Sequence, residues 1–141
     1  MTPEPTPIEL VPLGRMTLQL GAPAVMGGTP TGTFVVAEIA SGRFEGERLQ
    51  ATVKGSANAD WLTIGGDGSA ALDVRILLET DDGALIYMQY AGRIDLATQT
   101  AFAGPLFQTG DERYLWLNGI QAVAKGQTDS QTLVYDIHEV R

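Results

Sequence analysis

Apolar residues recur at every second position in short runs along this chain, and turn-forming residues separate the runs. Such alternation is typical of a β-strand with one buried face. Runs that return after about 8–12 residues favour an antiparallel barrel or sandwich. The segments predicted to contain strands are 10–20, 34–42, 42–55 as two short strands around Gly46, 60–64, 71–80, 84–92, 119–126 and 132–140.

The remaining segments carry no strand pattern. The stretch 26–33 is rich in Gly, Thr and Pro and is predicted as a loop. The best candidate for a helix is short and covers 110–118. Prolines at positions 3, 5 and 7 predict a disordered tail over 1–7, which leaves 8–141 as one domain. We therefore predict an all-β fold, a single antiparallel β-barrel of about eight to ten strands with at most one short helix near 110–118.

The segment 71–92 is informative because its turn specifies a strand register. Asp81-Asp82-Gly83 suits a three-residue loop in which Gly83 is left-handed. A two-residue loop would shift the register and exchange the positions of Tyr87 and Tyr90. The pairs implied by the longer loop are Thr80 with Ala84, Leu77 with Tyr87 and Arg75 with Gln89.

This register gives the hairpin two different faces. One face is apolar and predicts core: Val74, Ile76, Leu78, Ile86, Met88 and Tyr90. The other face mixes apolar, charged and polar groups: Asp73, Arg75, Leu77, Glu79, Leu85, Tyr87 and Gln89. The sequence leaves open whether this mixed face lines a cavity, faces solvent or forms a subunit interface.

The amino-acid composition argues against several classes of ligand and of catalytic or metal site. The chain has 141 residues and a net charge of −8, which argues against binding to nucleic acid or to an anionic membrane. It has no Cys and one His, so thiolate catalysis, a zinc ribbon and a multi-histidine metal site are not expected. The N-terminus lacks the basic and apolar regions of a secretory signal, so we expect a cytoplasmic protein.

Four motifs in order resemble one family. They are Ala59-Asp60-Trp61, Asp73-Val74-Arg75, Thr80-Asp81-Asp82-Gly83 followed by Ile86-Tyr87, and Thr109-Gly110-Asp111 followed by Tyr114, Trp116 and Asn118. With the surrounding residues, from about Ile8 to Val140, they resemble the bacterial and fungal domain-of-unknown-function family 3237. The resemblance implies a closed or nearly closed, loosely lipocalin-like antiparallel barrel, and it implies no established activity.

Two features depart from the family pattern. The segment before Phe107 is shorter than usual, which could leave one barrel mouth open or covered by a neighbouring subunit. His138 stands where the family more often has an aromatic residue, so it inherits no role. A surface or interface histidine is the simpler interpretation.

The mixed face supplies candidate catalytic groups. Asp73 would act as a base, and Arg75 and Tyr87 would stabilise developing negative charge. The alternative for Asp73 and Arg75 is an ordinary solvated or interfacial ion pair. Residues predicted to bind the substrate are Trp61, Tyr90, Tyr114, Trp116 and Asn118. Each aromatic residue has core filling as its alternative.

Two further patterns are better explained as turns. Residues 66–71 match G-x-G-x-x-A, but the alternating segment that follows is not the helix that a dinucleotide site requires. Asp81-Asp82 lacks the spacing of a calcium loop. We therefore expect no cofactor and no metal.

Three functions stay open. The first is a cofactor-independent acid/base enzyme, a lyase, isomerase or cyclase, that acts on an apolar or aromatic metabolite in the barrel. The second is a non-catalytic binding protein for an apolar ligand. The third is a structural barrel that uses the mixed face as an interface. A homo-oligomer, most simply a dimer, is expected.

Overall fold

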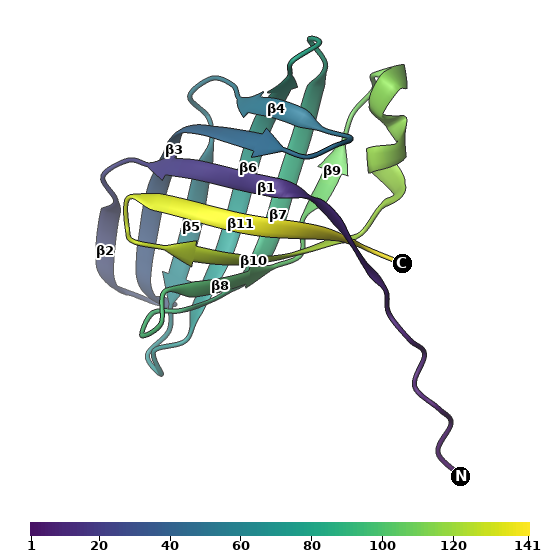
Figure 1. Cartoon of the computed structure of the whole chain (residues 1–141). Helices are drawn as coiled ribbons and strands as arrows, with labels where there is room; N and C mark the ends of the chain where they lie inside the picture. Colours follow the sequence, from purple (N-terminus) through teal and green to yellow (C-terminus); the bar gives the residue numbers. More distant parts are fainter.

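The computed structural model describes residues 1–141 and contains eleven strands and one short helix. Eight strands close into an antiparallel barrel (Figure 1). In chain order they are β1 (Leu10–Leu20), β3 (Gly32–Glu45), β5 (Ala59–Ile64), β6 (Ala70–Thr80), β7 (Leu85–Asp95), β8 (Thr100–Ala103), β10 (Ala122–Thr128) and β11 (Thr132–Val140). Around the barrel the order is β6-β5-β3-β1-β11-β10-β8-β7, and the β6–β7 hairpin closes the ring. The predicted fold class is confirmed.

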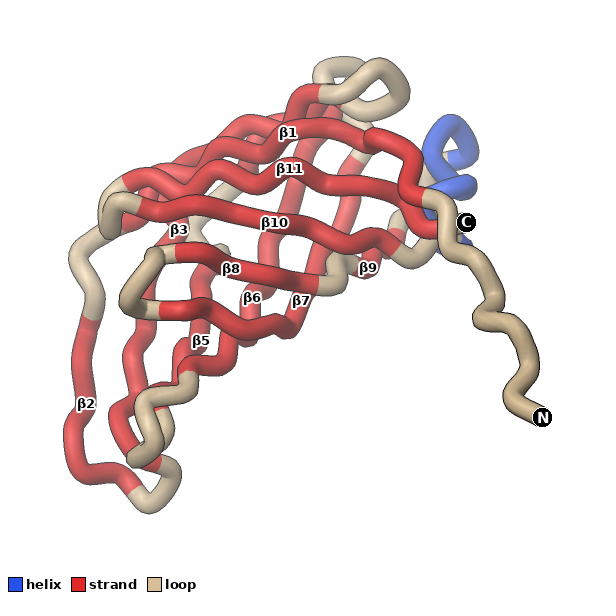
Figure 2. The backbone as a smooth tube through the Cα atoms, turned by 60° about the horizontal axis from the view of Figure 1, so that its bottom comes forward, coloured by secondary structure: helices blue, strands red, loops and turns tan.

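Three strands and the helix are additions to this ring. β2 (Ala24–Thr29) pairs with β3, β4 (Gln50–Val53) pairs with β3 and β6, and β9 (Leu106–Gln108) pairs with β7. The 3₁₀ helix η1 (Glu112–Gly119) lies beside β9, at the end of the barrel opposite β2 (Figures 1 and 2).

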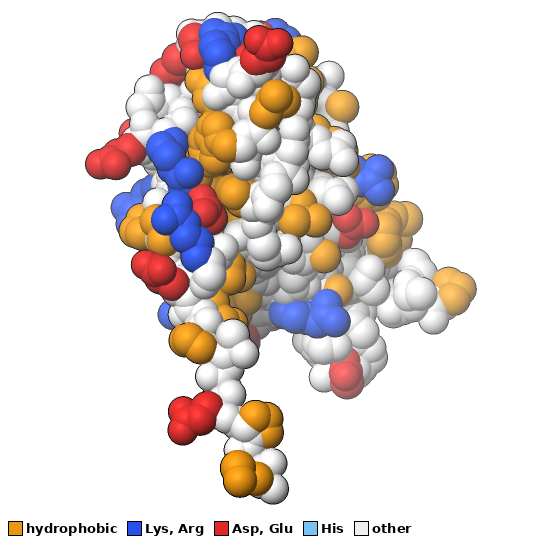
Figure 3. Space-filling view, turned by 90° about the vertical axis from the view of Figure 1, so that its right-hand side faces the viewer, with side chains coloured by type: hydrophobic (Ala, Val, Ile, Leu, Met, Phe, Trp, Pro, Cys, Tyr) orange, Lys and Arg blue, Asp and Glu red, His pale blue; other side chains and the backbone are white.

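The N-terminal segment 1–9 contains no helix or strand and runs away from the barrel. On the face that carries η1 and this segment, apolar side chains lie among acidic and basic ones (Figure 3). None of the helical structure has the length and apolar character that crossing a bilayer requires.

The sequence pattern did not predict three of the strands, β2, β8 and β9. The prediction of a loop over 26–33 is wrong at its start, because β2 extends to Thr29, and at its end, because β3 begins at Gly32. The residues of β2 are nearly all exposed, so no alternation marks them. β8 and β9 have four and three residues, too few to establish a period.

The hairpin of β6 and β7 has the predicted register. Arg75 lies opposite Gln89 and Leu77 opposite Tyr87. Gly83 has φ of 92°, and its N–H donates to the carbonyl of Thr80 at 2.9 Å. The face predicted as core is buried inside the barrel from Val74 to Tyr90, so the mixed face lies on the outside.

Two tyrosines fill the barrel interior from strands that are not neighbours. The rings of Tyr90 on β7 and Tyr135 on β11 meet edge to face, with 5.3 Å between centroids. Gly126 on β10 lies opposite Tyr135, and a Cβ added there would come within 2.6 Å of the tyrosine ring. The missing side chain at Gly126 therefore makes room for Tyr135.

The Gly126→Ala variant should be less stable than the wild type by about 1–3 kcal/mol, because a methyl group would overpack the space that the Tyr135 ring occupies. Urea unfolding monitored by circular dichroism measures the difference. The matched control is Gly66→Ala, where nothing lies within 4 Å of the added Cβ. Equal unfolding midpoints for the two variants would contradict this account of Gly126.

Candidate functional site

The three predicted catalytic residues lie on the outer face of the β6–β7 hairpin. Asp73 and Arg75 are exposed, and Tyr87 is half-buried. No ion pair joins Asp73 and Arg75 within the chain. Both side chains extend into solvent from one strand, where holding them together would gain little energy. Their assignment as catalytic groups stays a prediction.

A shallow hollow of about 580 Å³ lies on this outer face and contains two of the predicted residues, Tyr87 and Asn118. The Tyr87 hydroxyl donates to Gln89 Oε1 at 3.0 Å. The amide of Asn118 is occupied on both sides, since Oδ1 accepts from the N–H of Thr109 at 2.8 Å and Nδ2 donates to its carbonyl at 2.9 Å. Asn118 therefore fastens the loop before η1 to the helix, and this role occupies its Oδ1 and one of the two N–H donors of its Nδ2.

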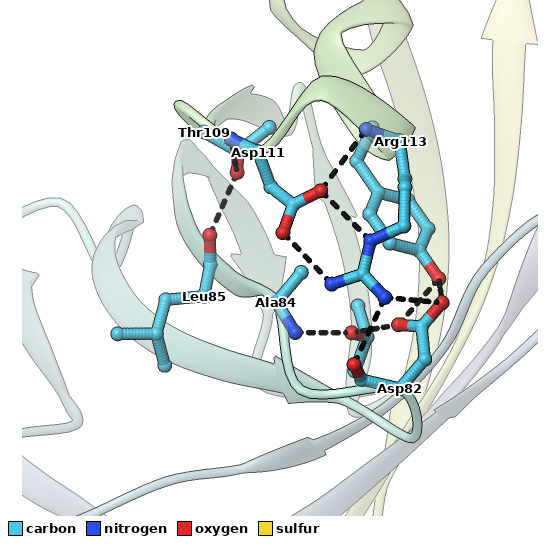
Figure 4. Close-up of polar contacts among 8 residues, drawn as sticks. Asp82, Ala84, Leu85, Thr109, Asp111 and Arg113 are labelled. Carbon is cyan, nitrogen blue, oxygen red and sulfur yellow. Dashed lines mark hydrogen bonds and ion pairs between the residues drawn. The ribbon is translucent and has the colours of Figure 1, made fainter.

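A polar network fixes η1 to the turn of the hairpin (Figure 4). The Tyr114 hydroxyl donates to both carboxylate oxygens of Asp82 at 2.9 Å. Arg113 donates to the carbonyl of Asp82 at 3.0 Å and forms a bidentate pair with Asp111. The Arg113 guanidinium lowers the pKa of Asp111 to about 2. This network gives Tyr114 and two of the sequence motifs a structural role.

The five predicted aromatic residues do not gather around one pocket. Trp61 is 45% exposed on the outside of β5, with its ring 6.3 Å from that of Phe34. Trp116 lies on η1 under the guanidinium of Arg48, at 4.4 Å. Tyr114 belongs to the network at the hairpin turn, and Tyr87 borders the outer hollow. Only Tyr90 faces the barrel interior, where it is 3% exposed.

A second polar group inside the barrel is Asp60, which the sequence analysis did not single out as a site residue. Asp60 lies between Ala37 of β3 and Val74 of β6 in the sheet. Because Val74 points into the core, the side chain of Asp60 starts on the inner face of the wall. Its Oδ1 accepts the backbone N–H of Asp73 at 3.2 Å, in a stretch where Asp73 has no backbone partner on β5.

Burial raises the pKa of Asp60 from its ordinary value of 3.8 to about 6. The hydrogen bond from the N–H of Asp73 opposes this rise, and the negative charge of Asp73 adds to it. A carboxyl group that titrates near neutral pH can accept and return a proton under physiological conditions. Asp60 is thus suited to proton transfer.

The hydroxyls of Tyr90 and Tyr135 are buried and lie near each other, but neither makes a hydrogen bond of good geometry. Burial is the main cause that raises the pKa of both phenols. Each hydroxyl also shifts the pKa of the other, and the charge of Asp60 adds a smaller rise to each, which places the three groups within electrostatic range. Both tyrosines therefore stay neutral and keep an O–H to donate. Buried polar atoms without a partner are rare and call for an explanation such as a catalytic role.

The space beside the two tyrosines is dry. A void with an empty volume of about 120 Å³ is bordered by both rings and leaves no room for a water molecule. Its other borders are apolar: Met16, Met88, Ala103, Pro105, Ala124 and Ile137. We call Asp60, Tyr90 and Tyr135 the inner cluster: two buried phenols that border the void and a half-buried carboxyl that does not border it.

The sequence contains a signal for the inner cluster. Asp60 stands in a strand whose other residues of the same parity are Leu62 and Ile64, so it is an acidic residue on an apolar face. Tyr135 shares its parity with Leu133 and Ile137. Both are polar residues on apolar strand faces, which marks them as unusual but does not show which face the barrel encloses.

Asp60 should make stability depend on pH. The folded chain holds the Asp60 proton up to about pH 6, whereas the unfolded chain releases it near 3.8, so stability falls as pH rises between these values. The full cost is about 3 kcal/mol. The Asp60→Asn variant lacks this cost, so its stability relative to wild type should improve from pH 4 to pH 7. Urea unfolding at several pH values measures this, and a constant difference would contradict the raised pKa.

Known proteins resemble this chain in sequence over nearly its whole length. A family model described as "Protein of unknown function (DUF3237)" matches residues 8–140. A UPF0311 protein of Rhodopseudomonas palustris (strain TIE-1) is 25% identical over 141 residues, covering 89% of this chain and 92% of that protein. The hydroalkoxylation enzyme phnH of Penicillium herquei is 28% identical over 118 residues, covering 84% of this chain and 74% of that enzyme.

Solved structures show the same barrel. A β-barrel-like protein of Acinetobacter baumannii AYE superposes with a TM-score of 0.87 at 30% sequence identity, and the match covers 98% of this chain and 99% of that one. Because the family model spans nearly the whole chain, the resemblance inferred from the four sequence motifs is confirmed. The protein belongs to the DUF3237 family of proteins of unknown function.

Proposed function

We propose that this protein is a cofactor-independent acid/base enzyme of the lyase or isomerase type, acting on an apolar or aromatic organic molecule at the inner cluster. The observation that carries the proposal is the pair of buried, unpartnered hydroxyls of Tyr90 and Tyr135 within electrostatic range of Asp60. A substrate oxygen would supply a hydrogen-bond partner, and the apolar side chains around the void would have to move apart to hold the rest of the molecule.

Each residue has a distinct role in this proposal. Asp60 takes a proton from the substrate and returns it to another atom, which a pKa of about 6 allows near neutral pH. Tyr90 and Tyr135 donate hydrogen bonds to the oxygen on which negative charge develops. Such donors are most effective in a dry site, where no water competes with them.

The relative phnH supports one reaction within this class. Hydroalkoxylation adds an alcohol across an alkene: the O–H bond and the C=C π bond break, and one C–O bond and one C–H bond form. No atom is lost and no electron is transferred, so an acid/base pair suffices. Asp60 would carry the proton from oxygen to carbon.

The experiment uses 2-allylphenol and 2-(3-methylbut-2-enyl)phenol as probes, with the cyclic ether product measured by chromatography. The Asp60→Asn variant should lower kcat/KM by about 10²- to 10⁴-fold, the contribution of general acid/base catalysis. Tyr90→Phe and Tyr135→Phe should each lower it by about 10²-fold through loss of one donor.

Asp136→Asn is the matched control, because this exposed aspartate follows Tyr135 and pairs with Arg15 outside the barrel. It should keep wild-type turnover. If Asp73→Asn and Arg75→Ala lose turnover while Asp60→Asn keeps it, the reaction takes place on the outer face of the β6–β7 hairpin and the proposal for Asp60 is wrong. A probe that binds and is never converted would instead support the non-catalytic binding protein.

A further inference from the structure

The barrel wall has a seam where β7 changes partner. β8 pairs with β7 from Gly92 onward, and β9 pairs with its other end up to Gln89. Tyr90 and Ala91 belong to neither ladder. The segment Gly104–Pro105 covers them. A single backbone bond joins it to β7, from the N–H of Gly104 to the carbonyl of Ala91 at 3.2 Å, and on its other side the carbonyl of Pro105 accepts the N–H of Ala122 at 3.2 Å. Pro105 has no N–H to add a second bond.

A hollow of about 260 Å³ lies over this seam on the outside of the barrel. Its lining is Asp73, Gln89, Tyr90, Ala91, Gly104 and Leu106. The dry void of the inner cluster lies on the other side of the same wall, since it is bordered by Tyr90, Ala103 and Pro105. Tyr90 borders both spaces, and the Gly104–Pro105 segment separates them.

Asp73 connects the outer hollow with the inner carboxyl. It lines the hollow, while its backbone N–H donates to Asp60 at 3.2 Å. The pairing of β5 with β6 is also interrupted here, because the ladder continues only at Thr63 and Ala71. Two weakly paired stretches of wall thus flank the inner cluster.

We infer that the seam at Gly104–Pro105 is the port through which a neutral, largely apolar ligand passes from the outer hollow to the inner cluster. The inference rests on the proposed function, which places the reaction at Asp60. The void beside Tyr90 and Tyr135 has no room even for water, so a ligand needs the wall to open locally. Local opening occurs where the wall has fewest backbone bonds, and the carboxylate of Asp73 at the rim disfavours anions.

A reversible disulfide across the seam tests the port. The chain has no Cys, so this is the only disulfide that an Ala91→Cys/Gly104→Cys variant can form within one chain. Ala91 is exposed, and a Cβ at Gly104 meets nothing nearer than 3.5 Å. The matched control is Arg93→Cys/Phe102→Cys, which joins paired residues of β7 and β8 beyond the seam.

Uptake of 4-fluorobenzyl alcohol, followed by ¹⁹F NMR, is the first readout and needs no turnover. The oxidised Ala91→Cys/Gly104→Cys protein should take up the probe at least about tenfold more slowly than its reduced form. The control pair should show no difference between the two forms. Equal uptake by the locked and reduced proteins, or no uptake by the reduced protein, would overturn the inference.

Amide hydrogen exchange is the second readout. The amides of Gly104 and Ala122, which bond to Ala91 and Pro105, should exchange about tenfold faster than the hydrogen-bonded amides between β7 and β8. Equal protection would count against local opening at the seam.

Two further measurements test whether the port prefers neutral ligands and whether the port and the reaction site can be told apart. The anion 4-fluorobenzoate should enter less readily than the alcohol, and Asp73→Asn should reduce this preference, whereas Glu47→Gln at an exposed position should not. Entry of both probes alike would overturn the neutral-ligand part. If the Ala91→Cys/Gly104→Cys disulfide blocks uptake while Asp60→Asn retains turnover, the port is supported and the proposed reaction site at Asp60 is contradicted.

Discussion

The rings of Tyr90 and Tyr135 meet edge to face inside the barrel and join two strands that are not neighbours in the sheet. Gly126 has no side chain, and this leaves room for the ring of Tyr135. The contact closes the interior so tightly that no water enters beside it. The same exclusion of water leaves both hydroxyls unpartnered and helps to explain why a nearby carboxyl titrates near neutrality. One packing contact therefore contributes both to the dry interior and to the raised pKa of Asp60.

Two of the four sequence motifs serve the scaffold. The turn at Asp82 and the helix residue Tyr114 hold each other across the outside of the molecule, and Asn118 closes the loop before the helix. Polar side chains at these positions satisfy backbone groups that regular secondary structure leaves free. A strong motif can thus mark a demanding turn as readily as an active site.

The sequence predicted what depends on local rules. The three-residue turn at Gly83 determined the register of the hairpin, and alternation identified its buried face. The sequence could not predict β2, whose residues are exposed on both faces. It also drew attention to Asp73, an acid on a mixed face, and away from Asp60, because side-chain parity in an isolated short strand does not show which face is enclosed. Only closure of the barrel brings Asp60 near Tyr90 and Tyr135.

The proton on Asp60 has a thermodynamic consequence for any ligand of the inner cluster. A ligand that places a donor against this carboxyl favours its ionised form, and one that places an acceptor there favours its protonated form. Near pH 6 either kind of binding exchanges a proton with the solvent. The heat of binding would then include the ionisation heat of the buffer, so calorimetry in two buffers reports the polarity of the ligand group that meets Asp60.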